Sequence, residues 1–177
     1  MTPPTTLLSP AAPPTAPAAT GPTGSAAPAA HRVLREELLR AVDADARWGT
    51  ATGLLLLAVD GTAADDDCAG AVAQRLRTAV RSRDRWLTLG GRSHALLLVD
   101  LPPALGEASV DRAADALLHA LESAERTAPQ RTGLRVSVGA GLAAGGACDA
   151  DDLLDLALDA LAAARAAGGH CARLRTA

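Results

Sequence analysis

The pattern of hydrophobic and polar positions changes near residue 31. Residues 1–30 consist mainly of Pro, Ala, Thr and Gly, with no charged side chain and no periodicity. Such a segment buries too little apolar surface to offset its ordering entropy, so we expect a disordered tail. From His31 onward apolar residues recur at regular spacing, which predicts one domain over residues 31–177.

Helical spacing, with apolar residues every third or fourth position and charges opposite, recurs along this domain. The first such stretch carries Val33, Leu34 and Leu38, and the later ones have acidic residues at their starts, which suits a helix N-terminus. The predicted helices are residues 31–49, a stretch from about Asp66, 109–127 and 149–169.

Short apolar or alternating runs between these helices predict strands. Gly90 and Gly91 lie between two of them and predict a tight hairpin turn, because glycine readily adopts positive φ. The element order is a helix followed by β-α-β-β-α-β-α-β, which favours an α+β sandwich with a mostly antiparallel five-stranded sheet between helices. The predicted strands are residues 52–60, 85–89, 94–100, 133–143 and 171–176.

Composition narrows the classes of function. A net charge of −3 argues against a nucleic-acid partner, and no run is long and apolar enough for a membrane span. The N-terminus lacks a secretory pattern, so we expect a cytoplasmic location. Trp48 and Trp86 are the only aromatic residues of the Phe, Trp and Tyr group, and we expect both in the core. His94, His119 and His170 come from separate elements, and we expect no metal site from them.

Three stretches in order resemble the GGDEF domain of diguanylate cyclases. The family's hairpin reads Gly-Gly-Asp/Glu-Glu-Phe, and here Gly90 and Gly91 form the motif turn within RDRWLTLGGRSHALLLVDLP. RVSVGAGLA at 135–143 is similar to a family strand ending in Ser-Ile-Gly, and LDALAAARAAGGH at 158–170 to its last helix. The resemblance covers residues 31–177 and implies a nucleotidyl cyclase-like α/β sandwich.

The resemblance also implies which residues would perform the chemistry. The family condenses two GTP molecules into cyclic di-GMP, with divalent metal held by carboxylates at two positions. Those positions match Ala58 and Arg92 here, a methyl group and a cation, and Ser93 and His94 complete the altered motif. We therefore expect no catalytic residues, no metal and no cofactor, with magnesium relevant only to a residual cyclase.

Some possible nucleotide contacts remain by the same resemblance. Asp60 is the second acidic residue of the family's first strand, Asp66 matches a guanine-contacting aspartate, and Arg165 matches a phosphate-binding lysine. The segment between Asp60 and Gly90 is shorter than the family pattern and lacks the asparagine partner of that aspartate. A hydrogen-bonding pocket that loses one partner loses discrimination steeply, so we expect a damaged GTP pocket.

Arg81 and Asp84 form an Arg-x-x-Asp pattern five residues before Gly90. In the family this pattern marks a site that binds the product, cyclic di-GMP. The arginine guanidinium donates two parallel hydrogen bonds to a phosphate or to a guanine edge, and an aspartate accepts hydrogen bonds from guanine N–H groups. Arg77, Arg83 and Arg85 crowd nearby and would strengthen an anion site. The simpler reading is an arginine-rich helix end, where arginine suits the helix dipole.

The sequence therefore favours a catalytically inactive, regulatory GGDEF-like domain that binds cyclic di-GMP through Arg81 and Asp84. The alternative is a module without a ligand, which dimerises or binds a protein partner through its first helix or a sheet edge. A residual diguanylate cyclase that uses GTP is the least favoured reading.

Overall fold

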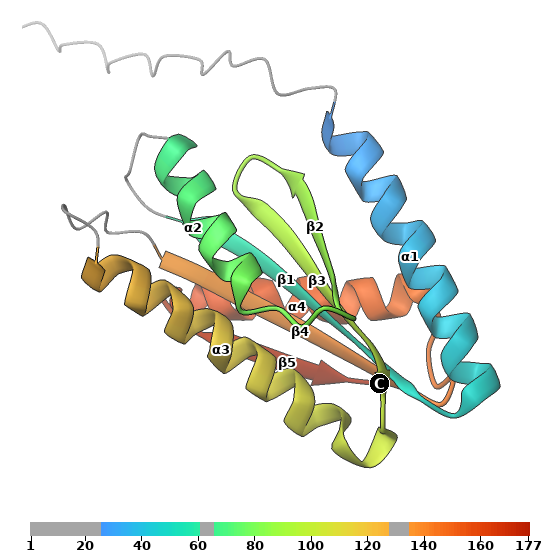
Figure 1. Cartoon of the computed structure of the whole chain (residues 1–177). Helices are drawn as coiled ribbons and strands as arrows, with labels where there is room; N and C mark the ends of the chain where they lie inside the picture. Colours follow the sequence, from blue (N-terminus) through green and yellow to red (C-terminus); the bar gives the residue numbers. More distant parts are fainter. Residues whose placement is uncertain (1–25, 61–65, 128–134) are drawn as a thin grey trace, which may run out of the picture.

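The computed structural model describes residues 26–60, 66–127 and 135–177, which form one layered α/β unit (Figure 1). Its strands are β1 (Ala51–Asp60), β2 (Arg85–Gly90), β3 (Ser93–Leu101), β4 (Arg135–Ala144) and β5 (Ala172–Thr176). Its helices are α1 (Ala26–Trp48), α2 (Asp66–Thr78), α3 (Gly106–Thr127) and α4 (Ala150–Ala166), with a 3₁₀ turn at Pro103–Leu105. Each predicted helix and strand is present.

The strands form a single sheet in the order β2-β3-β1-β4-β5. All neighbours are antiparallel except β4 and β5, so the predicted mostly antiparallel five-stranded sheet is confirmed. β1 lies at the centre of the sheet, and residues 51–59 are buried. A strand covered on both faces needs apolar side chains on both, which explains the uninterrupted leucine run from Leu54 to Leu57.

Helices cover both faces of the sheet (Figure 1), and an apolar core lies between the sheet and the helices on each face. One core packs α2 and α3 through residues such as Leu76 and Leu117. The other packs α1 and α4 through residues such as Leu38 and Leu153. The alternation of side chains along the strands divides them between the two cores. The sheet is therefore the middle of three layers.

The N-terminal boundary differs from the expectation. α1 begins at Ala26, whereas the predicted domain started at His31, and the rest of the predicted tail, residues 1–25, lies outside the described residues. Alanine favours helix, and Pro28 falls in the first turn, where its missing N–H costs no hydrogen bond. The prediction for Trp48 is also wrong: 77% of it is exposed at the end of α1, whereas Trp86 packs partly buried against the α2–α3 core.

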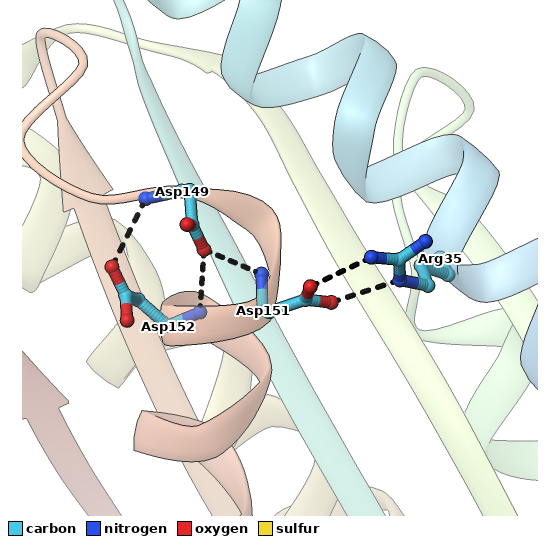
Figure 2. A network of polar contacts seen from close by, with 4 residues as sticks. All are labelled: Arg35, Asp149, Asp151 and Asp152. Carbon is cyan, nitrogen blue, oxygen red and sulfur yellow. Dashed lines mark hydrogen bonds and ion pairs between the residues drawn. The ribbon is translucent and has the colours of Figure 1, made fainter.

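Polar contacts join α1 to the start of α4 (Figure 2). The Arg35 guanidinium donates to both carboxylate oxygens of Asp151, at 2.9 and 2.7 Å. Hydrogen bonding from Arg35 lowers the pKa of Asp151 below its usual range. Asp149 caps α4 by accepting from the backbone of Asp151 and Asp152, as the acidic helix start predicted. Because the Arg35 and Asp151 side chains are exposed, this ion pair adds little to the folding free energy. Its main effect is to orient α1 relative to the start of α4.

The hairpin turn lies one residue later than predicted. Gly90 pairs with Ser93, so Gly91 and Arg92 are the turn residues rather than Gly90 and Gly91. The register shifts between Thr88 and Gly90, and this irregularity displaces the turn. Both glycines have positive φ, 128° at Gly90 and 51° at Gly91, as the glycine pair indicated.

α4 lies very close to β4 where β4 has glycines. A Cβ atom at Gly139 would overlap the backbone of Leu161 and Ala157, and one at Gly141 would lie 2.8 Å from the Leu153 carbonyl oxygen. Backbone atoms in a packed helix have little room to move. Gly139 ends the Ser-Val-Gly stretch of the sequence motif, so its role here is to admit the helix.

We therefore predict that Gly139→Ala destabilises the protein by about 3 kcal/mol or more, since overpacking against a rigid neighbour forces the layers apart. Urea unfolding followed by circular dichroism measures this loss. The matched control is Gly70→Ala on α2, where nothing lies within 4 Å of the added methyl group. That change should be neutral or stabilising by up to about 1 kcal/mol. Equal stability of Gly139→Ala and wild type would contradict the packing argument.

His94 follows the hairpin turn and is only 3% exposed. Its ring stacks on Trp86 with centroids 5.2 Å apart. Among the described residues its Nδ1 has no hydrogen-bond partner. Burial lowers the pKa of His94 below its ordinary value, because the charged imidazolium is poorly solvated there.

This burial makes the stability depend on pH. Between the lowered pKa of folded His94 and about 6.5, its value in the unfolded chain, the unfolded state binds more protons. The contribution of neutral His94 is therefore present above pH 6.5 and is lost as the pH falls below it. We predict that the wild type loses more unfolding free energy between pH 7.5 and 5.5 than His94→Phe does. Parallel pH dependences in urea titrations would contradict this.

Candidate functional site

The end of β1 lies beside the hairpin turn. Ala58 pairs with Ser93 on β3 and with Ser137 on β4, and the Val59 N–H donates to the Arg92 carbonyl at 2.9 Å. The structure thus brings together Ala58 and Arg92, the two positions that the resemblance matched to metal-binding carboxylates, with Ser93 beside them. Ala58 is 2% exposed, and the His94 ring is buried behind the turn.

These residues do not fit a magnesium ion. Magnesium prefers carboxylate and water oxygens, whereas Ala58 ends in a methyl group and Arg92 has a positive charge. A cation beside a divalent ion raises the electrostatic energy instead of lowering it. Among residues 26–60, 66–127 and 135–177, no group of three or more His, Cys, Asp or Glu side chains is arranged to hold a metal ion.

Asp60, at the end of β1, is paired with Arg165 of α4. The guanidinium donates from Nη2 to Asp60 Oδ1 at 3.0 Å and from Nε to Oδ2 at 3.3 Å. The Ser137 hydroxyl also donates to Oδ2, at 3.3 Å. The predicted nucleotide contacts Asp60 and Arg165 therefore meet, but they bind each other. Asp66 begins α2, and its side chain is outside the described part of the chain.

A shallow pocket of about 410 Å³ opens beside this pair. Arg135, at the start of β4, lines it and donates to the Gly168 carbonyl at 2.8 Å. Gly168, Gly169 and His170 follow α4 with φ values of 101°, 74° and 54°, so the chain turns sharply here. Sequence reasoning missed Arg135 and Ser137, because only the pairing of β4 with β1 places them next to Asp60. The pocket is lined by Asp60, Arg135, Ser137, Arg165, Gly168 and Gly169.

Arg81 and Asp84 lie in a separate cavity of about 210 Å³ between the α2–β2 loop and α3. The structure therefore brings the two predicted ligand residues together. Ser109 and Arg112 of α3 line the same cavity, and sequence reasoning missed them because they are distant along the chain. Its remaining lining is apolar apart from backbone: Ala79, Val80, Leu96, Leu98, Leu101, Ala113, Ala116 and Leu117.

The electrostatics of this cavity centre on Asp84. Its Oδ1 atom is buried and accepts no hydrogen bond within the described residues. Burial raises the pKa of Asp84 above its ordinary value, while the charges of Arg81 and Arg83 oppose that rise. An ionised carboxylate with a buried oxygen that lacks a donor is costly, and a ligand N–H would remove that cost.

Not all of the neighbouring arginines belong to this cavity. Arg85, which we expected to strengthen the anion site, instead lies 3.2 Å from Glu37 of α1 in an ion pair. Glu37 also contacts Arg40 at 2.8 Å. The packing of α1 on β2 turns Arg85 toward the opposite face of the sheet. That expectation was wrong for Arg85.

His119 and His170 both lie near one carboxylate, that of Glu122. His119 Nδ1 lies 3.9 Å from Glu122 Oε2, and His170 Nε2 lies 3.6 Å from Glu122 Oε1. His119 and Glu122 are both on α3, so of these two contacts it is the His170–Glu122 one that links α3 to the turn after α4. In the described part of the chain, no helix is long and apolar enough to span a membrane.

Comparisons with known proteins agree with this architecture. A search among curated proteins gives no match. The GGDEF domain of TpbB (YfiN) from Pseudomonas aeruginosa superposes with a TM-score of 0.68 at 24% identity, over 81% of this chain and 87% of that one. DgcB of Caulobacter crescentus, solved in complex with cyclic di-GMP, gives 0.61 at 18% identity, over 82% and 88%. A microbial GGDEF domain solved with cyclic di-GMP gives 0.57 at 25% identity, over 85% and 92%.

The family model described as "Diguanylate cyclase, GGDEF domain" matches residues 29–171. This match spans α1 through α4 and includes both the hairpin and the Arg81–Asp84 cavity. The chain therefore belongs to the GGDEF domain family, whose characteristic activity is that of a diguanylate cyclase.

Proposed function

We propose that this chain is a catalytically inactive GGDEF domain that binds cyclic di-GMP through the cavity of Arg81 and Asp84. The observation that supports the proposal best is the buried Asp84 Oδ1, which accepts no hydrogen bond from the described residues, in a cavity that Arg81 and Arg112 also line. A guanine edge offers N–H donors to a carboxylate and acceptors to an arginine fork. Cyclic di-GMP carries both guanine edges and phosphates.

The size and lining of the cavity suit part of such a ligand. A volume of about 210 Å³ is smaller than the roughly 300–1,000 Å³ of pockets that enclose whole drug-sized ligands. The cavity would therefore hold one base and leave the phosphates outside, within reach of the exposed Arg81. The apolar side chains of Leu98 and Val80 provide a surface against which a flat base packs.

The proposed loss of catalysis rests on the hairpin. Ala58 and Arg92 supply no carboxylate oxygen at the places where the family binds metal, and Asp60 is held by Arg165 and Ser137. No cofactor is needed for the proposed receptor role. The proposed location is the cytoplasm, where a second-messenger receptor meets its ligand.

The alternative is an interaction module without a ligand. α1 exposes Leu39 and Trp48, at 48% and 77%, on a helix that also packs on the sheet. Large apolar side chains on a surface helix are a common feature of binding interfaces. A second copy of the chain or a protein partner would use this helix. Size-exclusion chromatography with light scattering distinguishes a dimer from a monomer.

We predict that cyclic di-GMP binds the full chain with micromolar affinity in calorimetric titration. Arg81→Ala and Asp84→Ala should each weaken binding at least about tenfold, because each removes a charge-assisted hydrogen bond of about 1.5–3 kcal/mol. Arg75→Ala, an exposed α2 arginine outside the cavity, is the control for lost charge and should bind like wild type. If cyclic di-GMP gives no heat of binding with the wild type, or if all variants bind it equally, the interaction module without a ligand is favoured.

We also predict that the chain does not convert GTP to cyclic di-GMP in the presence of magnesium or manganese, since Ala58 and Arg92 cannot ligate the metal. Product analysis by liquid chromatography after long incubation measures this. The control is heat-denatured protein at the same concentration. Product that accumulates in proportion to native protein would show that the proposed loss of catalysis is wrong.

A further inference from the structure

β5 forms one edge of the sheet and, among the described strands, pairs only with β4 (Figure 1). At one end of this pairing the Val138 N–H donates to the Cys171 carbonyl at 3.0 Å, and at the other the Ala177 N–H donates to the Leu142 carbonyl at 3.2 Å. In a parallel pair, every second residue directs both its N–H and its C=O toward the neighbouring strand, and the residues between direct theirs away. These two bonds therefore determine which residues of β5 face outward.

The outward backbone groups belong to alternate residues of β5. Arg173 and Arg175 direct their N–H and C=O groups toward β4. Those of Ala172, Leu174 and Thr176 consequently face away from the sheet. Within the described part of the chain no strand lies beyond β5, so these groups have no strand partner. Such an open edge is a template on which a further extended chain adds by backbone hydrogen bonds.

The side chains of β5 give this edge two different faces. Ala172 and Leu174 are half-buried and pack against the α2–α3 core. Because side chains alternate along a strand, Arg173 and Arg175 lie on the other face of the sheet, where α4 packs, and both are exposed. Neither guanidinium has a hydrogen-bond or ion-pair partner within the described residues. The edge thus combines open backbone groups with two uncompensated positive charges on one face.

We propose that the β5 edge binds an extended acidic segment of a partner protein, which adds to the sheet as a further strand. Directly paired residues of neighbouring strands point to the same face of a sheet. Acidic side chains of the partner therefore lie opposite Arg173 and Arg175. Apolar side chains of the partner lie opposite Leu174 and extend the α2–α3 core. The segment that fits this edge alternates acidic and apolar residues.

The same two arginines argue against a second copy of this chain as the occupant. Two β5 edges paired antiparallel about a twofold axis place the arginines of both copies on one face. Like charges at neighbouring positions of two strands are destabilising, and charged side chains on an edge strand prevent self-association in this way. An acidic strand reverses the sign of the interaction. The charge of the edge therefore selects a partner of opposite charge.

The test titrates a short acetylated peptide of alternating Val and Glu into the full chain, with a peptide that has Lys in place of each Glu as the matched control. Fluorescence anisotropy of the labelled peptides gives the affinities. The ¹⁵N amide resonances of Leu174 and Thr176 report whether binding occurs at the outward edge. We expect the Glu peptide to bind at least about tenfold more tightly than the Lys peptide. Arg173→Glu combined with Arg175→Glu should reverse this preference.

Two further comparisons separate strand addition from a general attraction of charge. Arg75→Glu combined with Arg77→Glu changes the net charge equally at exposed positions of α2, and should keep the preference for the Glu peptide. Thr176→Pro removes one outward N–H and no bond to β4, which proline tolerates on an edge strand. It should bind the Glu peptide about threefold or more weakly than Thr176→Ala, the loss of one hydrogen bond.

The proposal is overturned if the Glu peptide does not bind or binds no more tightly than the Lys peptide. It is also overturned if the α2 double variant loses the preference, or if Thr176→Pro binds like Thr176→Ala. All the substituted side chains are exposed, and urea unfolding verifies that each variant is folded. β5 shares no residue with the Arg81–Asp84 cavity, so the inference is independent of cyclic di-GMP binding.

Discussion

The close contact of α4 with β4 is the constraint on which the rest of the structure depends. Gly139 and Gly141 let the helix backbone approach the strand to a distance that no side chain would allow. This contact fixes both ends of α4. At its C-terminal end Arg165 meets Asp60, and at its N-terminal end Asp151 meets Arg35 of α1. One pair of small residues thus sets the geometry of a pocket and of an interhelical junction.

Two polar pockets in the described part of the chain differ in how their charged groups are satisfied. In the pocket beside Asp60, Arg165 and Ser137 donate to the Asp60 carboxylate, so both of its oxygens have hydrogen-bond partners. In the Arg81–Asp84 cavity, a buried carboxylate oxygen lacks a donor within the described residues. A ligand gains most where a polar group is left unsatisfied, because binding then removes an existing cost. This contrast is the physical basis for placing the proposed ligand at Asp84.

Changes at the hairpin are accommodated without loss of the fold. His94 is buried and stacks on Trp86, and its Nδ1 has no hydrogen-bond partner among the residues that the structure describes. Arg92 occupies the turn itself. The β1–β3 pairing continues to Ala58 and Ser93 beside these residues. Backbone hydrogen bonds hold the strands in register whatever the turn side chains are. The fold therefore accommodates a buried imidazole and an arginine at this hairpin.

The sequence predicted the elements well and their edges less well. Leucine runs bounded by Gly and Asp predicted β1 and β3. The acidic start of α4 indicated the helix cap that Asp149 provides. The shift of the hairpin turn to Gly91 and Arg92 was missed, because a strand irregularity depends on pairing across the sheet. Trp48 was misplaced because periodicity alone does not tell which helix faces remain uncovered.

The sequence by itself determined the order of helices and strands, the family, and the absence of carboxylates at Ala58 and Arg92, since these follow from local spacing and residue type. Only the tertiary structure decided which distant side chains meet. It paired Asp60 with Arg165, turned Arg85 toward Glu37, and placed Arg112 beside Asp84. Such contacts depend on the register of the strands and on where the helices pack against the sheet. Side-chain packing across the whole sheet sets both.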